Sequence, residues 1–272
     1  MKQEPVNFIS MKKSFEFENL TLIQGNCLEE MDKFYRKIGS SVDLIFADPP
    51  YFLSNGGVTC QNGKMTKVNK GDWDQSQGHA INHQFNLEWL KRCQKLLTPN
   101  GTIFVSGTFH VIYSIGHAMQ QLGMKLLNNI IWQKPNPPPN LACRYFTHSS
   151  ETVIWAAKTE KSKHKFNYPL MKSTNGGKQM KDVWKMQAAP KGERKFGRHP
   201  TQKPIALLDR IIAAASSKGN LVLDPFNGSG STGVVCLNLG RRYIGIENEK
   251  KYFDLSIKRF KSIQKKASPQ SR

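Results

Sequence analysis

The sequence predicts an α/β fold with a mostly parallel, seven-stranded sheet. Short β-branched or apolar runs alternate along the chain with segments whose apolar residues recur at helical spacing, and such alternation is typical of βαβ units. At 272 residues and 38% hydrophobic content, the chain is long enough to bury the core that this sheet needs. The expected strands are 20–24, 43–47, 102–106, 126–132, 151–156, 220–223 and 242–246, and the expected helices are 85–97, 111–122, 205–215, 233–239 and 252–263.

The length allows one α/β domain or two small ones, and several segments depart from the alternation. Residues 52–84 are rich in Gly, Asn, Lys and Gln, which predicts a mobile loop. Three prolines at 137–139 favour a stiff, extended connection. Residues 158–198 are basic and aromatic without clear periodicity and are expected to form a small insert, while 262–272 are expected to be a disordered tail.

The charge balance indicates a polyanionic partner. Forty Lys and Arg residues against twenty Asp and Glu residues give a formal net charge of +20. Nucleic acid fits this charge best, and an anionic membrane surface is the competing interpretation. No long apolar span is present and the first residues lack the apolar core of a signal peptide, so we expect a cytoplasmic protein without a membrane anchor.

Neither disulfide nor metal chemistry is expected. The five cysteines are scattered and form no Cys-x-x-Cys pair, which favours reduced thiols. His79 and His83 have the spacing of ligands on one helical turn, but they fall in a polar segment with no evident third ligand.

A glycine-rich turn follows the predicted strand 220–223. The segment from Pro225 to Gly233 leads into an apolar helix, and such a turn lets a ligand approach the backbone at the helix N-terminus. It is not a phosphate-binding P-loop, because no Lys precedes Ser231 and Thr232. The alternative is a purely structural strand-to-helix turn.

Two carboxylates and an aromatic ring accompany this turn. Glu247, at the end of the next strand, is placed to accept hydrogen bonds from both ribose hydroxyls of a nucleoside. Asp224 can hold the ammonium of an amino-acid moiety, which S-adenosylmethionine has and NAD lacks, and the adenosine would lie beside Phe226. Few residues remain after this unit, so the other strands must precede it, and the cofactor loop and the reactive centre are encoded in reversed order.

The reactive centre is predicted at Asp48-Pro49-Pro50-Tyr51, which leaves the carboxyl end of the strand 43–47. An exocyclic amine is a poor nucleophile because its lone pair is delocalised into the ring. Hydrogen bonds from its N–H groups to Asp48 and to the Pro49 carbonyl would localise that lone pair, and Tyr51 would stack on the base. The alternative is a Pro-Pro turn that closes a strand.

With these motifs in this order and a basic insert between them, residues 18–262 resemble the β group of DNA amino-methyltransferases. The resemblance implies a Rossmann-like S-adenosylmethionine-dependent methyltransferase fold with circularly permuted motif order, and makes 1–272 a single catalytic domain. Further segments resemble the second methylase of DpnII-type restriction-modification systems. These segments are 46–57, Lys70-Gly71-Asp72-Trp73-Asp74, 143–148 and His199-Pro200-Thr201-Gln202-Lys203-Pro204.

That resemblance implies methylation of adenine N6 in GATC, on single- as well as double-stranded DNA, which protects host DNA. It also implies a cognate restriction endonuclease as genetic partner and leaves a homodimer open. Asp rather than Ser at position 48 favours adenine N6 over cytosine N4. Methylation of cytosine C5 is disfavoured because no Cys nucleophile follows a Pro.

The resemblance also assigns residues. Asn26, where the family usually has Asp, and Cys27 match positions near the cofactor adenine, and Lys203 matches a residue near the cofactor carboxylate. The alternative for Lys203 is a helix start with Pro204 in the first turn. The expected catalytic residues are Asp48, Pro49, Pro50 and Tyr51, and the expected cofactor-binding residues are Asn26, Cys27, Asp48, Lys203, Asp224, Phe226, Gly228, Ser229, Gly230, Thr232 and Glu247.

DNA contacts are expected from the basic insert 158–198, as a target-recognition element that follows phosphates. Tyr145 and Phe146 offer stacking faces, although aromatic core packing explains them as well. Trp73 either closes over the active site or anchors its loop. The expected DNA-binding residues are Arg144, Lys178, Lys181, Arg194 and Arg198.

Other functions remain open at this level. A methyltransferase acting on cytosine N4, on an RNA base or on a protein amide has a similar reactive centre. A DNA-binding module without catalysis and a nicotinamide oxidoreductase are the alternatives from other classes. The intact tetrapeptide disfavours the first of these, and the absence of an evident hydride-transfer site disfavours the second.

Overall fold

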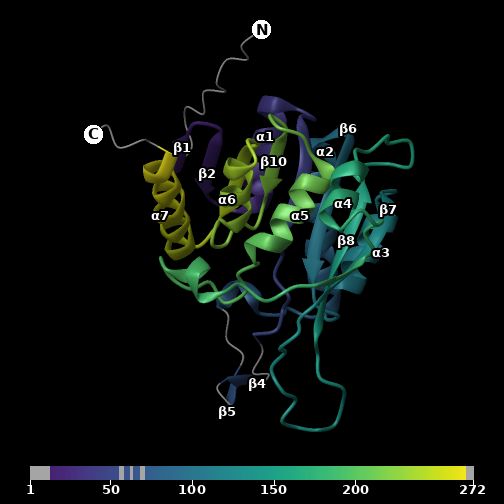
Figure 1. Ribbon diagram of the computed structural model, residues 1–272, viewed down its shortest axis with the longest axis vertical. Coiled ribbons are helices and arrows are strands. Elements are labelled where there is room, and N and C mark those ends of the chain that lie inside the picture. Colours follow the sequence, from purple (N-terminus) through teal and green to yellow (C-terminus); the bar gives the residue numbers. More distant parts are fainter. Residues whose placement is uncertain (1–12, 55–57, 62–63, 68–70, 268–272) are drawn as a thin grey trace.

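A twisted sheet forms the centre of the computed structural model, which describes residues 13–54, 58–61, 64–67 and 71–267 (Figure 1). Within these residues, nine strands follow the order β1-β2-β11-β10-β3-β6-β8-β7-β9. Their bounds are β1 Ser14–Phe17, β2 Leu20–Gln24, β3 Val42–Ala47, β6 Leu97–Gly107, β7 Lys125–Gln133, β8 Ser150–Ala157, β9 Val183–Lys185, β10 Leu221–Asp224 and β11 Arg242–Glu247. A separate hairpin pairs β4 Val58–Gln61 with β5 Lys64–Lys67.

All seven expected strands are present, but the expected strand number is wrong because β1 and β9 extend the sheet at its two edges. These strands have four and three residues, too few to show a periodic pattern. The central strands β2, β11, β10, β3 and β6 are parallel, and β8 is antiparallel to both of its neighbours. The prediction of a mostly parallel α/β sheet is therefore confirmed.

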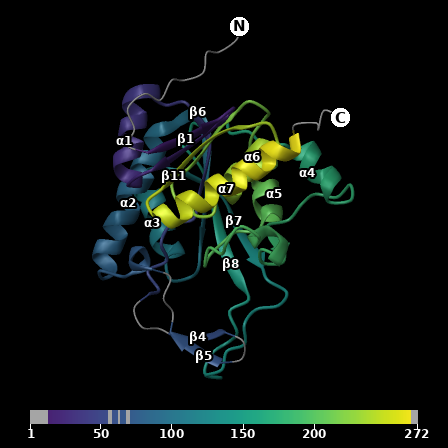
Figure 2. The same cartoon turned by 90° about the vertical axis from the view of Figure 1, so that its left-hand side faces the viewer.

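Helices cover both faces of the sheet (Figure 2). On one face, α1 Cys27–Ile38, α2 His79–Leu96 and α3 Ile112–Gln121 bury residues such as Phe34, Trp89 and Ile115. On the other, α5 Ile205–Ala215, α6 Ser231–Asn238 and α7 Lys250–Ala267 bury Leu208 and Phe260, and the short α4 Tyr168–Thr174 packs on α5. None of the described helices is long and apolar enough to cross a membrane.

The helices differ from the predictions in several places, and the short α4 was not predicted. Helix α1 was not predicted, although Asn26 caps it by accepting a hydrogen bond from Leu28 N at 2.9 Å. Helix α2 begins at His79, so the end of the segment expected to be a loop, 52–84, is helical. Helix α7 continues to Ala267, so the expected disordered tail, 262–272, starts too early, and 268–272 lie outside the described residues.

Strand order brings the two motifs together. Strands β10 and β11 come from the end of the chain, yet they lie between β2 and β3 from its beginning. The four strands are parallel, so their carboxyl ends meet at one edge of the sheet, called here the reactive edge. This arrangement places Asp48, after β3, next to Asp224, at the end of β10, as expected for a parallel α/β sheet.

Candidate active site

A cavity of about 200 Å³ opens at the reactive edge. Its walls come from the segments that follow β2, β3, β10 and β11 and from the stretch before α5. All but one of the expected cofactor-binding residues line it, namely Asn26, Cys27, Asp48, Lys203, Asp224, Phe226, Gly228, Ser229, Thr232 and Glu247. Of the tetrapeptide, Asp48 and Pro50 line the cavity, whereas Pro49 and Tyr51 are buried behind it.

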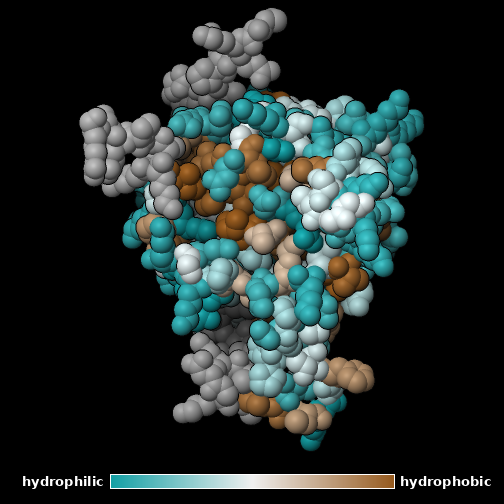
Figure 3. Space-filling model, in the orientation of Figure 1, coloured by the Kyte–Doolittle hydropathy of each residue, from teal (hydrophilic) through white to brown (hydrophobic). Residues whose placement is uncertain are grey.

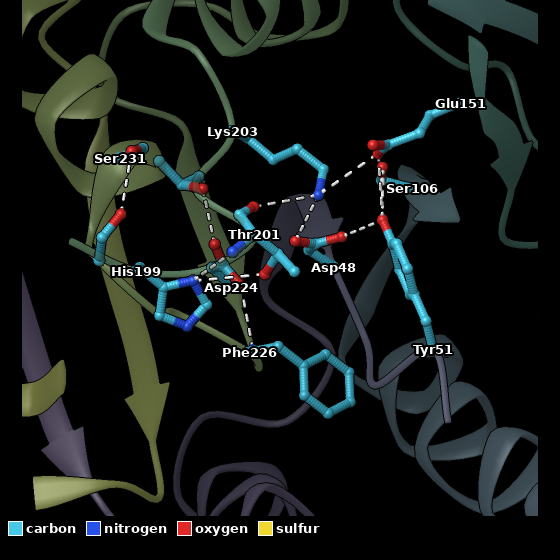
Figure 4. A network of polar contacts seen from close by, with 12 residues as sticks. Asp48, Tyr51, Ser106, Glu151, His199, Thr201, Lys203, Asp224, Phe226 and Ser231 are labelled. Carbon is cyan, nitrogen blue, oxygen red and sulfur yellow. Dashed lines mark hydrogen bonds and ion pairs between the residues drawn. The ribbon is translucent and has the colours of Figure 1, made fainter. Parts of the chain in front are cut away.

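The Asp48 carboxylate is held from two sides (Figure 4). The Tyr51 hydroxyl donates to Asp48 Oδ1 at 2.7 Å, and Lys203 Nζ donates to Asp48 Oδ2 at 2.6 Å. The Tyr51 hydroxyl also lies 3.3 Å from Ser106 Oγ and 3.3 Å from Glu151 Oε2. These contacts fix the carboxylate that the sequence identified as the acceptor for the target amine.

Opposed charges set the protonation of this network. Burial raises the pKa of Asp48, the Lys203 ammonium opposes that shift, and the neighbouring Glu151 carboxylate adds to it. Burial also raises the pKa of Glu151, but Lys203 and Lys134 outweigh it and lower that pKa to about 2. Burial lowers the pKa of Lys203, yet Asp48 and Glu151 outweigh burial and raise it. Lys203 therefore remains an ammonium between two carboxylates.

Tyr51 has less free surface than the sequence suggested. The residue is 4% exposed and packs in the core between the sheet and α1 to α3. Its ring therefore presents no open face in this arrangement. Base stacking on Tyr51 stays a prediction.

Asp74 is a site residue that the sequence analysis missed. It is fully buried, and its Oδ1 accepts hydrogen bonds from the backbone N–H groups of Tyr51 and Phe52 at 2.8 and 2.9 Å. Its Oδ2 accepts from Leu53 N and from the Ser54 hydroxyl. One carboxylate thus fixes the backbone immediately after the reactive tetrapeptide, including Phe52 at φ +58°. The signal was its place in the segment that ends Asp72-Trp73-Asp74.

The second half of the site contains two buried carboxylates. Asp224 is 2% exposed and accepts from Phe226 N at 3.0 Å and from the Thr232 hydroxyl at 2.6 Å. Glu247 accepts from Gly228 N at 2.7 Å and from Glu249 N at 2.8 Å. Burial raises the pKa of each carboxyl to about 7. Each oxygen retains a lone pair for a ligand in the cavity.

Two glycines of the turn have different structural roles. Gly228 lines the cavity at φ +54°, and a Cβ there would lie 3.3 Å from the His199 ring. Gly230 was expected to bind the cofactor but does not line the cavity. It begins α6 at φ +76°, where a Cβ would meet Phe260 Cζ at 2.8 Å and Ser256 Oγ at 2.9 Å. Its role is therefore to let α7 pack against α6.

Aromatic rings form much of the cavity wall. Phe226 meets Trp89 edge to face, with ring centroids 5.3 Å apart. Trp73 stacks on His199 at 6.1 Å, and His199 meets Tyr252 at 4.2 Å. Trp73, His199 and Tyr252 all line the cavity, so Trp73 is attached to the cavity wall. His199 and Tyr252 were not predicted as site residues, although His199 opens the motif that contains Lys203.

The expected DNA-binding residues do not form one cluster. Arg144 is exposed in the loop 134–149, which projects beyond the reactive edge in Figure 1. Arg198 directly precedes the cavity residue His199, and Arg194 lies slightly earlier in the same segment. Lys178 and Lys181 are exposed ahead of β9, farther along the same insert.

The first part of the insert 158–198 lies away from the reactive edge, near the amino-terminal ends of the parallel strands. Lys163 N donates to Asn100 Oδ1, near the start of β6, and Asn167 N donates to Ala214 O, near the end of α5. Both contacts are remote from Asp48, at the opposite ends of the parallel strands. The chain then returns to the reactive edge, where Glu193 accepts from Ile205 N at 3.1 Å.

Neither histidine of the candidate metal pair lies in a loop, because both belong to α2. His83 Nδ1 lies 2.8 Å from Ser114 Oγ, its Nε2 lies 3.1 Å from Gln121 Oε1, and its ring stacks on His117. Over the described part of the chain, no three His, Cys, Asp or Glu side chains are grouped to hold a metal ion.

Comparison with known proteins identifies the family. A model of the N6/N4 DNA methylase family matches residues 42–258. The chain belongs to this family. The type II methyltransferase M2.DpnII of Streptococcus pneumoniae is 53% identical over 232 residues, covering 85% of this chain and 87% of that protein. M2.LlaDCHI of Lactococcus lactis subsp. cremoris is 51% identical over 249 residues, covering 91% of each.

Solved structures agree with this assignment. The complex of M1.HpyAVI with S-adenosylmethionine superposes with a TM-score of 0.68 at 30% identity, covering 89% of this chain and 98% of that one. The cytosine-N4-specific PvuII DNA methyltransferase superposes with a TM-score of 0.73 at 20% identity, covering 92% and 90%, a likeness of fold alone. The methylase family predicted from the two motifs is confirmed. This chain is an S-adenosylmethionine-dependent DNA methyltransferase of the restriction-modification type.

Proposed function

We propose that this methyltransferase acts on adenine N6 in GATC, in single- as well as double-stranded DNA. The observation that carries the proposal is the Asp48 carboxylate, fixed by Tyr51 and Lys203 beside the cavity that contains Asp224 and Glu247. Asp at position 48 and the similarity to M2.DpnII both support adenine over cytosine.

The residues that line the cavity fit S-adenosylmethionine by their chemistry. Asp224 offers a buried carboxylate for the ammonium, Glu247 offers one for the ribose hydroxyls, and Phe226 offers a ring beside the adenine. Gly228 supplies a stretch of wall where a side chain would crowd His199. When bound there, the cofactor supplies a methyl group on a sulfonium, which is attacked by an amine nitrogen.

The chain's own residues prepare that nitrogen. Asp48 and the Pro49 carbonyl accept hydrogen bonds from its two N–H groups, which draws the lone pair out of conjugation with the ring. After transfer the nitrogen carries a positive charge and loses one proton. The Asp48 carboxylate, whose pKa burial raises, is placed to receive that proton before it passes to solvent.

Product analysis tests the proposal directly. The purified protein is incubated with S-adenosylmethionine and DNA containing GATC, and the nucleosides are separated after digestion. N6-methyl-2′-deoxyadenosine in GATC, absent with Asp48→Ala and with a one-base variant of the site, supports the proposal. Methylated cytosine, or methylation of RNA or protein alone, would reject it.

The proposal extends to the cellular role. Methylation in the cytoplasm would protect host DNA from a cognate endonuclease, and the protein would act as one catalytic domain, alone or as a homodimer. Recognition would involve the loop 134–149 and the part of the insert that returns to the reactive edge, 183–198. Genomic DNA from a methylation-free host that expresses the protein should resist an endonuclease that cuts unmethylated GATC.

A further inference from the structure

Four aromatic side chains form a continuous row on the surface at the reactive edge. The Tyr145 and His148 ring centroids lie 5.3 Å apart, His148 and Phe109 lie 4.7 Å apart, and Phe109 and His110 lie 3.8 Å apart. We call these residues the ring strip. Two segments far apart in the sequence build it, the turn after β6 and the loop before β8.

The ring strip is open to solvent. Phe109 is 46% exposed, Tyr145 is 60% exposed, and the neighbouring Phe146 is 97% exposed. Apolar side chains gather at the lower tip of the molecule in Figure 3, where Figure 1 places the loop 134–149. Core packing therefore does not explain these rings. Exposed apolar residues that gather on one surface indicate a binding site.

Both segments of the ring strip adjoin the reaction centre. Ser106, three residues before Phe109, and Glu151, three residues after His148, each lie 3.3 Å from the Tyr51 hydroxyl. The segments that carry the strip are therefore held to the reactive tetrapeptide through Ser106 and Glu151. A nucleic acid whose target base enters the cavity has its neighbouring bases close to these rings.

A groove beside the strip adds polar groups. It is lined by Phe109 and His148 themselves and by the amide side chains of Gln120, Asn128 and Asn129. Such amides can both donate to and accept from base edges. Glu151 also lines the groove, and its carboxylate is paired with Lys134 and Lys203, so it does not repel a polyanion as a free charge would.

We propose that the ring strip stacks bases that have lost their pairing partners next to the target adenine. The inference rests on the proposed action on DNA and deepens it by naming the surface that receives unpaired bases. Aromatic side chains stack on any base, because every base has a π-face. The exposed Arg144 and the net charge of +20 supply attraction for the backbone.

Binding of labelled oligonucleotides tests this surface. We expect Phe109→Ala and Tyr145→Ala each to weaken binding of a single-stranded GATC oligonucleotide by about 5- to 100-fold, measured by fluorescence anisotropy. Binding of S-adenosylmethionine should not change, since neither residue lines the cofactor cavity. The matched control is Tyr35→Ala, since Tyr35 on α1 is 43% exposed and should have no effect.

Abasic oligonucleotides supply the matching test on the DNA. Removing the bases that flank the target should weaken binding to the wild type and abolish the difference between wild type and Phe109→Ala. The inference is overturned if Phe109→Ala and Tyr145→Ala bind the single-stranded oligonucleotide as tightly as the wild type. It is also overturned if the difference in affinity between wild type and variant persists on abasic DNA. Dissociation of a dimer by these substitutions in sedimentation overturns it too, because that result would make the strip an interface between copies. Failure of methylation with normal base-dependent binding would reject only the proposed function.

Discussion

Lys203 Nζ lies 2.6 Å from Asp48 Oδ2, although 155 positions separate the two residues. The Lys203 side chain is 5% exposed, and it neutralises the carboxylate that is proposed to accept a hydrogen bond from the target amine. Lys203 directly precedes the N-cap of α5, Pro204, so the helix start expected for this position and the ion pair occur together. This contact links the reactive tetrapeptide to the motif that borders the cofactor cavity.

Replacing Lys203 by Met should move the activity profile to higher pH. Burial raises the pKa of Asp48, and the variant removes the charge that opposes this shift. A carboxylate with a higher pKa is ionised only at higher pH, so the acidic limb of kcat against pH should shift upward. At neutral pH kcat should fall about 10- to 100-fold. A weaker affinity for S-adenosylmethionine with an unchanged profile would instead assign Lys203 to the cofactor.

Replacing Glu151 by Gln should move the same limb in the opposite direction. The Glu151 carboxylate raises the pKa of Asp48, and Gln keeps its size without the charge. The pKa of Asp48 should therefore fall, and activity should persist to lower pH than in the wild type. The network of Asp48, Lys203 and Glu151 therefore predicts that Lys203→Met and Glu151→Gln shift the acidic limb of kcat against pH in opposite directions. Shifts in the same direction would contradict it.

Cofactor affinity should increase as pH rises through about 7. Burial raises the pKa of Asp224 to about 7, so this carboxylate becomes an effective partner for an ammonium only above that pH. Titration calorimetry should detect the dependence in the wild type and a weak, nearly flat affinity in Asp224→Asn. Glu247→Gln is the control, because it removes the other carboxyl with a pKa of about 7 and should keep the dependence.

Asp74 should be essential for the stability of the reactive segment. Asp74→Ala leaves the buried N–H groups of Tyr51 and Phe52 without an acceptor, at about 1–3 kcal/mol for each. The free energy of unfolding in urea should fall by about 2–5 kcal/mol. Asp74→Asn keeps one carbonyl oxygen for these two donors and should lose less than half as much. Equal losses in both variants would refute the role of the acceptor.

Gly230→Ala should lower the free energy of unfolding by more than backbone strain alone would. A Cβ at φ +76° would collide with Phe260 and Ser256, which adds about 1–3 kcal/mol of overpacking to about 1–2 kcal/mol of strain. Gly219→Ala isolates the strain, because φ is +83° there and no atom lies within 4 Å of the added Cβ. Urea unfolding should therefore rank wild type, Gly219→Ala and Gly230→Ala in order of decreasing stability.

The sequence predicted the centre of the fold well because the central strands are apolar runs bounded by turns. It also contained the signal for α1, since Met31, Phe34 and Ile38 recur at helical spacing, but six charged residues in the same twelve obscured it. The edge strands β1 and β9 form only because each pairs with a neighbouring strand. Their short sequences contain no periodic pattern that would predict this pairing.

The sequence predicted the site residues that belong to local motifs. It did not predict the residues that are brought into the site by the register of paired strands. Asp48 and the turn after Asp224 form motifs that can be read from neighbouring residues. Ser106 and Glu151 contact Tyr51 only because β6 pairs with β8 so that Ser106 lies opposite Val153. Those long-range contacts follow from the alignment of strands, which no local pattern reveals.

The strand order has a consequence for how the protein is made. Tyr243 of β11 pairs with Leu20 of β2, so the middle of the sheet closes only once the ribosome has added β10 and β11, long after β2 and β3. Until then β2 and β3 have no neighbour between them, and their backbone groups and apolar faces remain available to chaperones or to other nascent chains. Methylation competence therefore arises only after β10 and β11 have been synthesised, and a chain that stops before β10 lacks both the turn proposed to bind the methyl donor and the strands that join its two halves.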